Sequence, residues 1–591
     1  MPRAFAEIWP LPAAWRPVVS RLRLLTVLVA GFASALSLLV LHGLRPGHGY
    51  EPLATVGLAI AAGALVLETL LSAWEGPRLR DLTRRRPIAL ALLALFLLQL
   101  LLLRFGGDQR EGWLQRLALG DLTHAYLLSL QLYVLATLLA KFAQVHSRLS
   151  RIRMAPGRLL FLLFVSLAAL GMLLLKLPGM LASGSQLRWI DALFTATSAV
   201  CVTGLSVISI DGALSDSGQV LLAGLIQVGG MGIMAVTGFL AIAAGSGLGI
   251  RDRAFLADVL HADVVSEVVS HLRLIFWFTL IVEAVGALLL VDVFRSAVPG
   301  QNPVRLAIFH SISAFCNAGF STLPDNLASL MDQARGLWIF MLLIALGGIG
   351  FGNLLMSWAW LRRRLRGQHV PPPLGLRLVW ISSVILWSTG FVFFFLVERG
   401  NSMAGMPWHR GMLHALFLSV TARTAGFNTV EVVNFAQPTL LLLMLFMFIG
   451  GASGSTAGGV KLGTIAVMVA VVRSLFRGRE DVSILGRRIA PGSVREAIAV
   501  VFVGGLVVFA GLSALLLWED LPFLPVAFEA VSALGTVGLS MGVTASLGDG
   551  AKLTLIVLML LGRVGPLSLV LALGRSRKAT LQLPHERVTV G

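Results

Sequence analysis

Charge is scarce in this sequence. Asp, Glu, Lys and Arg make up 13% of its 591 residues, against about 25% in a typical soluble protein. Hydrophobic residues make up 57%. This composition excludes a set of ordinary soluble domains and is typical of a polytopic membrane protein. Cysteine is also nearly absent, and the two present, Cys201 and Cys316, are too few for a disulfide framework.

Other missing features narrow the function. No charged segment followed by a short apolar stretch and a cleavage site opens the chain, so we expect the first span to act as its own insertion signal. No dinucleotide-binding fingerprint or soluble domain is present, so nucleotide control would require a separate protein, and we expect no organic cofactor. Acids and histidines do not cluster within the apolar segments, which disfavours the alternative of a membrane enzyme acting on lipid-linked substrates.

Long apolar runs dominate what is present. A helix needs about 20 apolar residues to cross the hydrocarbon. Twelve such candidate spans are 22–44, 52–74, 87–104, 122–144, 158–178, 217–245, 270–294, 336–360, 376–397, 437–472, 496–517 and 552–573. Lys and Arg gather in alternate loops, which the positive-inside rule assigns to the cytoplasm. The net charge of +18 therefore reflects topology rather than nucleic acid binding, and we expect an inner-membrane protein among lipids with both termini cytoplasmic.

From about residue 158 onward, one pattern occurs four times: a long span, a shorter apolar stretch that ends in a glycine turn, and a second span. The short stretches hold too few residues to cross, so each is expected to be re-entrant. They share a Phe, then Ser or Thr with Ala, then the glycine: FTATSAVCVTG at 194–204, FHSISAFCNAG at 309–319, FLSVTARTAG at 417–426 and FEAVSALGTVG at 528–538. The third copy reaches its glycine one residue sooner, so its short helix must sit slightly differently.

Internal repeats define an architecture. We expect an all-α polytopic membrane protein in which four helix–pore-helix–helix units surround a pseudo-fourfold pore, preceded by about four extra transmembrane helices that serve as scaffold or as a docking site. The expected divisions are an N-terminal extension (1–157), pore unit 1 (158–245), pore unit 2 (268–361), pore unit 3 with a Gly-rich loop (374–474), pore unit 4 (494–574) and a cytoplasmic tail (575–591).

The glycine turns suit a cation path. A monovalent cation sheds most of its water in a narrow pore, and rings of backbone carbonyls can replace that water. Such turns require φ values that glycine adopts freely, and the short helices aim the negative ends of their dipoles at the path. The candidate filter residues are Val202, Thr203, Gly204, Asn317, Ala318, Gly319, Thr424, Ala425, Gly426, Thr536, Val537 and Gly538.

The second spans of the first three units are rich in glycine. In units 1 and 2, close helix packing explains the glycines, so the spans at 217–245 and 336–360 are expected to be continuous. In unit 3, GGASGSTAGGVK at 450–461 holds too many Gly and Ser for a helix, because each interior Gly costs about 1 kcal/mol. A break is expected there.

Residues 158–573 resemble the Trk/Ktr/HKT superfamily of potassium transporters. The resemblance rests on the four turns, TARTAGFNT at 421–429, GGASGSTAGGVK at 450–461 and GRVGPL at 562–567. It implies K⁺ uptake, one pore per subunit, a homodimer, and a cytoplasmic ring of regulatory subunits that bind ATP/ADP or NAD. Four glycines fit the potassium-selective pattern of this family. A sodium-selective or weakly selective pathway is the alternative, and a coupling or activating role for Na⁺ stays open.

The resemblance also implies a gate. The Gly-rich segment is similar to an intramembrane loop that plugs the pore below the filter. Arg563 is similar to an arginine that acts as an electrostatic barrier there, and a structural ion pair is the alternative for this residue. For Lys461, the alternative is a lysine that snorkels from the end of a span to the membrane surface. The implied gate residues are Gly450, Gly451, Gly454, Ser455, Thr456, Gly458, Gly459, Lys461 and Arg563.

The remaining polar residues carry weaker expectations. We expect Arg423 to pair with Glu529 and brace the filter from behind, because a free arginine facing the path would repel cations. Asp191 is expected to favour the N-terminus of its helix rather than to bind an ion. A side-chain contact of Asn317 with the ion is the less favoured interpretation, and Glu283 is either functional or hydrogen bonded within the bundle.

Two histidines, His310 and His414, are expected to be packed with satisfied polar atoms. Carboxylates in the outward loops, among them Asp216 and Asp332, either attract cations to the mouth or are simply solvated.

Overall fold

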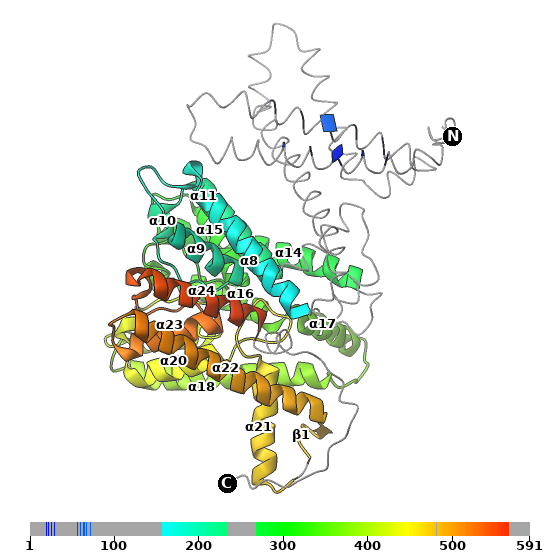
Figure 1. The fold of residues 1–591 in the computed structure, drawn as a ribbon. Coiled ribbons are helices and arrows are strands. Elements are labelled where there is room, and N and C mark those ends of the chain that lie inside the picture. Colours follow the sequence, from blue (N-terminus) through cyan, green and yellow to red (C-terminus); the bar gives the residue numbers. More distant parts are fainter. Residues whose placement is uncertain are drawn as a thin grey trace, which may run out of the picture.

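The computed structural model describes residues 156–232, 268–479 and 481–565, together with scattered positions before residue 156 (Figure 1). These residues are almost entirely helical. The strands among them are β1 (Ser483–Ile484) and β2 (Arg487–Arg488), which pair antiparallel in a short hairpin. The four expected N-terminal spans, apart from those scattered positions, and the tail at 575–591 lie outside the described residues, as do the C-terminal ends of the spans expected at 217–245 and 552–573.

Four consecutive segments, here called units 1 to 4, share one order of elements: a long helix, a short helix, a glycine turn and a further helix. Unit 1 contains α8 (Pro156–Leu175), η3 (Pro178–Met180), α9 (Trp189–Cys201), α10 (Ile210–Ala213) and α11 (Asp216–Met231). Unit 2 contains α14 (Val268–Ala297), α15 (Pro303–Phe315), η5 (Ala328–Leu330), α16 (Ala334–Ile349) and α17 (Phe351–Leu365). Unit 3 contains α18 (Leu374–Glu398), α19 (Trp408–Thr421), η6 (Val432–Asn434), α20 (Gln437–Phe448) and α21 (Leu462–Phe476). Unit 4 contains α22 (Pro491–Trp518), α23 (Phe523–Gly535), η7 (Thr544–Ser546) and α24 (Asp549–Val564).

Local sequence fixes where several of these helices begin. Asn302 caps α15, since its side-chain oxygen accepts hydrogen bonds from the backbone N–H groups of Val304 and Arg305 at 3.0 and 3.3 Å. Pro303 follows at the first helical position, where a missing N–H costs nothing. Ser215 caps α11 in the same way. These caps set the starting points of the helices that carry and flank the glycine turns.

Three helices of the described part are long and apolar enough to cross a membrane: Leu272–Ala297 in α14, Leu374–Glu398 in α18 and Pro491–Trp518 in α22. A fourth span results if α16 and α17 count as one. The short helices α9 and α23 are apolar but have 13 residues each, which is too few to cross. Length therefore separates the first helices of units 2, 3 and 4 from the apolar short helices that carry the turns.

The second helix of unit 2 is bent, and the expectation of a continuous helix over 336–360 is wrong. α16 and α17 meet at 97° around Gly350, whose φ is +90°. Only glycine adopts this conformation without strain. The break frees carbonyl groups at the end of α16, and another segment of the chain uses them, as described below.

The units pack in a closed cycle. α11 of unit 1 packs on α15 of unit 2, α16 on α19, α20 on α23, and α24 of unit 4 returns to α9 of unit 1. Figure 1 shows α24 (red) beside α9 (cyan), while α21 (yellow) projects from the helical body with β1 next to it. One cluster of buried hydrophobic residues contains side chains from all four units, and a second joins units 3 and 4. The glycine turns lie where the four short helices end.

Candidate ion pathway

Three of the short helices end in the same hydrogen-bonded motif. At the end of α9, the N–H of Val202 donates to the carbonyl of Ala199 at 3.1 Å, and the N–H of Thr203 donates to that of Ser198 at 2.8 Å. These two hydrogen bonds together form the Schellman motif, which requires a residue in the left-handed conformation just after the helix. α15 and α23 end with the same two bonds.

The turn of unit 3 is closed more tightly. The N–H of Ala425 donates to the carbonyl of Thr421 at 3.0 Å, a bond that spans one residue fewer than in the other units. The donor follows the left-handed Thr424, so this turn lacks the two bonds of the Schellman motif. The shorter spacing before Gly426 therefore changes the closure of the turn and leaves its glycine in place.

Each turn holds two residues with positive φ in the same positions. The glycines Gly204, Gly319, Gly426 and Gly538 have φ of 93°, 67°, 77° and 94°. Two residues before them, Val202, Asn317, Thr424 and Thr536 have φ of 57°, 58°, 68° and 50°. Val and Thr are β-branched, so this conformation is strained. Strain of this kind persists only where surrounding structure enforces it, and it gathers at functional sites.

The four turns form a ring. A methyl group added to Gly204 would collide with the carbonyl oxygen of Ala318 in the next unit. The same relation joins Gly319 to the carbonyl of Ala425, Gly426 to that of Val537, and Gly538 to that of Thr203. The cycle closes on itself, so one carbonyl oxygen from each unit borders the ring beside the glycine of its neighbour.

Hydroxyl groups behind the ring orient these peptides. Ser198 and Ser532 accept hydrogen bonds from the backbone N–H groups of Gly204 and Gly538, both at 3.1 Å. Because a trans peptide points its N–H and C=O in opposite directions, a backward N–H turns the preceding carbonyl forward, toward the ring. In units 2 and 3, Ser313 and Thr421 instead donate to the carbonyls that follow the glycine, at 2.8 and 2.7 Å.

The predicted break in unit 3 is present as a loop at 449–461 between α20 and α21, here called the glycine-rich loop. Its neck is closed by a hydrogen bond from the N–H of Gly450 to the carbonyl of Val460 at 2.9 Å. Its tip docks on the bend of unit 2: the N–H of Ala452 donates to Gly348 at 3.1 Å, and that of Phe351 donates to Gly454 at 3.1 Å. Irregular backbone at membrane depth must be satisfied by protein in this way.

The loop reaches under two opposite turns. A methyl group on Gly458 would collide with the hydroxyl of Thr536 in unit 4. On the other side, the hydroxyl of Thr456 lies 3.5 Å from the carbonyl oxygen of Phe315 in unit 2. Units 2 and 4 are not neighbours in the ring, so the loop extends from below one turn to below the opposite one.

Two half-buried cations donate hydrogen bonds to carbonyl groups of the loop. Arg563 donates to the carbonyls of Thr456 in the loop and Gly229 in α11, which ties units 4, 3 and 1 together. Lys461 donates to the carbonyl of Ala457 at 2.6 Å, within the loop itself. Neither cation has a carboxylate partner among the described residues. Both positive charges therefore rest on backbone carbonyls below the ring.

The expected pairing of Arg423 with Glu529 is wrong. Arg423 lies over the indole of Trp387, 5.5 Å from the ring centroid. Glu529 accepts hydrogen bonds from the hydroxyls of Ser540 at 2.5 Å and Thr544 at 2.9 Å, within its own unit. The local hydroxyls satisfy the carboxylate and fix the segment after the fourth turn, which leaves Arg423 to a cation–π contact.

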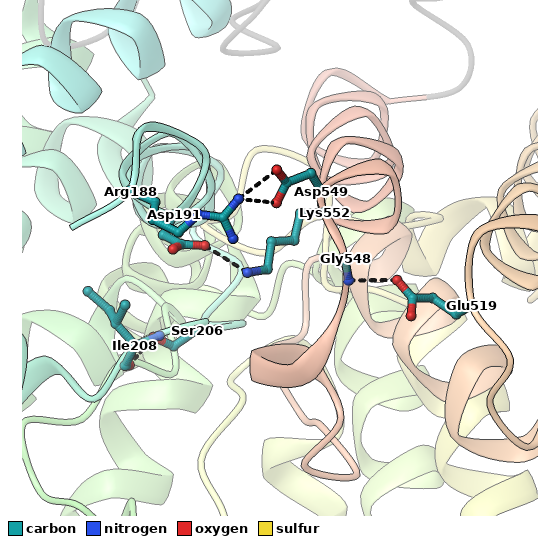
Figure 2. Close-up of polar contacts among 8 residues, drawn as sticks. All are labelled: Arg188, Asp191, Ser206, Ile208, Glu519, Gly548, Asp549 and Lys552. Atoms are coloured by element: carbon teal, nitrogen blue, oxygen red, sulfur yellow. Dashed lines mark hydrogen bonds and ion pairs between the residues drawn. The ribbon is translucent and has the colours of Figure 1, made fainter. Parts of the chain in front are cut away.

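Asp191 forms an ion pair rather than only favouring a helix end. Its carboxylate accepts from Lys552 of α24 at 2.7 Å, and Arg188 reaches both carboxylate oxygens of Asp549 at 2.8 and 2.6 Å (Figure 2). The Asp191–Lys552 pair is buried, whereas the Arg188–Asp549 pair is exposed. Both pairs join unit 4 to unit 1 and help to close the cycle.

Ion pairs also join the next two units in order. Arg305 of α15 pairs with Asp216 of α11, and Arg410 of α19 pairs with Asp332 just before α16. These two outward carboxylates therefore act as partners of arginines as well as surface charges. Among the described residues, no ion pair joins α20 to α23, where the contact is apolar.

The other predicted polar residues point away from the ring. The amide nitrogen of Asn317 lies 3.0 Å from the carbonyl of Ala314 and 3.2 Å from that of Ile344 in the orientation that satisfies both, so its side chain faces the helices behind the turn. His310 contacts Leu306 and Ser321 through its two ring nitrogens, which confirms a packed, satisfied residue. His414 contacts Thr429 through Nδ1 at 2.9 Å, but its Nε2 is buried without a hydrogen-bond partner, so the expectation of satisfied polar atoms is wrong for this histidine.

Sequence reasoning missed the bend at Gly350 and the strained residues two positions before each glycine. A signal for the bend was present, since four of the six residues of GGIGFG at 347–352 are glycine, a higher density than the five of twelve in the loop that was predicted to break. No group of three or more His, Cys, Asp or Glu that could hold a metal ion occurs in the described part of the chain.

Comparison with known proteins identifies the family. A family model for TrkH, described as cation transport protein, matches residues 163–578. Ktr system potassium uptake protein B of Bacillus subtilis is 33% identical over 447 residues, which cover 74% of this chain and 98% of that protein. Potassium/sodium uptake protein NtpJ of Enterococcus hirae is 33% identical over 451 residues, 75% of this chain and 98% of that protein.

The crystal structure of the potassium transporter TrkH from Vibrio parahaemolyticus has the same fold, with a TM-score of 0.59 at 20% identity over 95% of this chain and 97% of that one. The chain thus belongs to the TrkH family of cation transport proteins within the Trk/Ktr superfamily, and it is a multi-pass membrane transporter rather than an enzyme.

Proposed function

We propose that this protein carries K⁺ into the cell and that the four glycine turns are its selectivity filter. The observation that carries the proposal is the closed ring, in which one carbonyl oxygen from each unit lies beside the glycine of the next. Backbone carbonyls of this kind replace the hydration shell of a monovalent cation. Relatives named as potassium uptake proteins, which this chain matches over nearly their whole length, support K⁺ as the ion.

The proposal extends to the surroundings of the filter. Four pore units with the divisions predicted above would surround a pseudo-fourfold axis, and about four further helices would precede them. We also propose a homodimer in the inner membrane with both termini in the cytoplasm. A cytoplasmic nucleotide-binding ring would regulate it, which agrees with relatives whose names assign them to a Ktr system.

The glycine-rich loop is proposed as the gate. It lies between opposite turns of the ring and is held by carbonyl groups of α16 and by Arg563. These bonds are few and polar, so a regulator could release the loop without breaking a hydrophobic core. Arg563 would also place a fixed positive charge below the filter, which would oppose cation passage while the loop is in place.

A second candidate is a pathway for both K⁺ and Na⁺. The relative from Enterococcus hirae is named a potassium/sodium uptake protein, and its identity to this chain equals that of the Bacillus protein. Glycine in all four turns favours the potassium pathway, because a serine in the first turn would narrow the ring. Na⁺ would then act as a competing, coupling or activating ion.

Growth at low K⁺ tests the function. Cells stripped of their own K⁺ uptake systems would receive the native chain or Gly204→Ser, with or without a regulatory partner, and Rb⁺ and Na⁺ uptake would be followed in parallel. We expect the native chain to restore growth and the serine variant to lose preference for K⁺ over Na⁺. Equal uptake of the two ions by the native chain would favour the second candidate. Absence of uptake of either ion, with the partner supplied, would overturn both.

A further inference from the structure

Units 2 and 3 share a contact between their first helix and their short helix. In unit 2, the hydroxyl of Ser311 donates to the backbone carbonyl of Glu283 at 2.7 Å. In unit 3, the hydroxyl of Ser419 donates to the backbone carbonyl of Trp387 at 2.9 Å. Glu283 and Trp387 therefore occupy matching positions in α14 and α18.

The side chains at these two positions reach the same place behind the glycine turn. Glu283 contacts the thiol of Cys316, and Trp387 lies under the guanidinium of Arg423. Cys316 and Arg423 each stand three residues before the glycine of their turn. In each of these two units, one side chain of the first helix thus contacts the residue three positions before the glycine. The contact is between a carboxylate and a thiol in unit 2, and between an indole and a guanidinium in unit 3.

Glu283 is an acid in the middle of a membrane span. Its side chain is buried, with the residue 5% exposed, and it has no cationic partner among the described residues. A polar group at this depth is costly unless hydrogen bonds satisfy it. Gln227 of α11 donates to its Oε2 at 2.8 Å, and the Sγ of Cys316 lies 3.7 Å from its Oε1 and 3.6 Å from the Oε1 of Gln227. The three side chains form a closed triangle.

This triangle joins three elements at the end of one turn. Gln227 belongs to α11 of unit 1, Glu283 to α14 of unit 2, and Cys316 ends α15 directly before the left-handed residue of the turn. Gly230 of α11 leaves the notch that holds the thiol, since a methyl group there would lie 2.5 Å from Sγ. The thiol is confined between two helices, and the Ala318 carbonyl that borders the ring follows it by two residues.

We propose that Glu283 is a positioning residue of the filter, which sets the preference for K⁺ by fixing the turn of unit 2. This inference rests on the proposed function. Glu283 acts through Cys316 and Gln227 and does not touch the ion. Loss of the carboxylate frees the end of α15, so the Ala318 carbonyl no longer holds its distance from the axis. A ring loosened at one corner discriminates less between ions of different radius.

The test uses the full-length chain in cells that lack other K⁺ uptake. We expect Glu283→Leu and Cys316→Ala to raise the KM for K⁺ about fivefold, the effect of one lost hydrogen bond, and to lower the K⁺/Na⁺ uptake ratio similarly. Glu283→Gln and Cys316→Ser keep an acceptor and a donor, so both values should stay within about twofold of the native chain. The matched control is Ser311→Ala, which removes the bond to the Glu283 backbone and leaves the triangle intact; its KM and ion ratio should be unchanged.

Outcomes separate this inference from the proposed function. If Glu283→Leu and Cys316→Ala keep the native KM and ion ratio, with uptake reduced only in proportion to the amount of protein in the membrane, Glu283 is structural and the inference is overturned. If Glu283→Leu does not reach the membrane, the Cys316 pair decides alone, because Cys316→Ala removes one sulfur atom and Cys316→Ser replaces that atom by oxygen. Absence of K⁺ uptake by the native chain would overturn the proposed function itself.

Discussion

Unit 3 differs from the other three units at several points around the same ring. Its turn is one residue shorter and closes with a bond from Ala425 to Thr421, where the others use the two bonds of the Schellman motif. Arg423 stands where the others carry Cys201, Cys316 and Gly535. Its second helix is replaced by α20, the glycine-rich loop and α21. All four glycines nevertheless have positive φ and meet in one ring, so geometry is uniform at the ring and diverges outside it.

The contact between units 3 and 4 shows the same divergence. Ion pairs join units 4 and 1, 1 and 2, and 2 and 3, whereas α20 and α23 meet through apolar side chains such as Met447 and Phe528. The unit that carries the loop is therefore joined to its next neighbour without an ion pair among the described residues, and the charge that links the two is that of Arg563 on the Thr456 carbonyl.

We expect the largest effect from a substitution that adds a side chain at one of the four glycines of the ring. Gly426→Ala would strain a residue with φ of +77° and drive a methyl group into the carbonyl of Val537. The two costs together exceed about 3 kcal/mol, so we expect K⁺ uptake to fall more than about 100-fold. Gly405→Ala is the control, because its φ of +82° is similar and nothing lies within 4 Å of the added methyl group. Rb⁺ uptake measures both, and equal losses would mean that strain alone, not the ring, explains the effect.

The features of the fold that could be predicted from the sequence are those that neighbouring residues determine. The repeated Phe, Ser/Thr-Ala and Gly pattern predicted the short helices and turns, and the glycine density at 450–461 predicted the loop. The bend at Gly350 was missed because packing glycines and breaking glycines look alike until another segment, here Gly454, uses the freed backbone groups. The Arg423–Glu529 pair was wrong for a related reason: opposite charge identified two partners, while Ser540 and Thr544 lay closer to the acid.

Substitutions that remove ion pairs between units 4 and 1 make this contact more similar to the apolar contact between units 3 and 4. Lys552→Met leaves Asp191 buried without its cation, which should destabilise the protein by about 3–5 kcal/mol. Arg188→Gln breaks the neighbouring pair, whose side chains are 62% and 55% exposed, and should cost about 1 kcal/mol or less. Thermal unfolding of detergent-purified protein, followed by size-exclusion chromatography, compares them. Adding Asp191→Asn to Lys552→Met should recover part of the loss; similar midpoints for both single variants would contradict the burial argument.

The role of the glycine-rich loop of unit 3 can be tested by substituting Arg563, which binds the loop to other units. Arg563→Gln weakens the bonds to Thr456 and Gly229 and removes the positive charge below the ring. We expect uptake without a regulatory partner to rise about tenfold, since two charge-assisted hydrogen bonds are weakened. Lys461→Gln is the matched control, because that lysine bonds within the loop and does not tie it to other units. Basal Rb⁺ uptake that stays unchanged in Arg563→Gln would show that this arginine does not restrain the proposed gate.

The smallest expected effect concerns the one arginine behind a turn. Arg423→Cys gives unit 3 the residue that units 1 and 2 carry in that place. Arg423 directly follows Ala422, the C-cap of α19, and a positive charge near a helix C-terminus offsets the negative end of the helix dipole. Removing it should strengthen cation binding by about 0.3–1 kcal/mol, which lowers the KM for K⁺ about two- to fivefold. No carboxylate pairs with Arg423 among the described residues, so this variant leaves no buried acid unpaired and should fold normally. Arg423→Lys keeps the charge and should keep the native KM; a lowered KM in both variants would assign the effect to the lost contact with Trp387 instead of to charge.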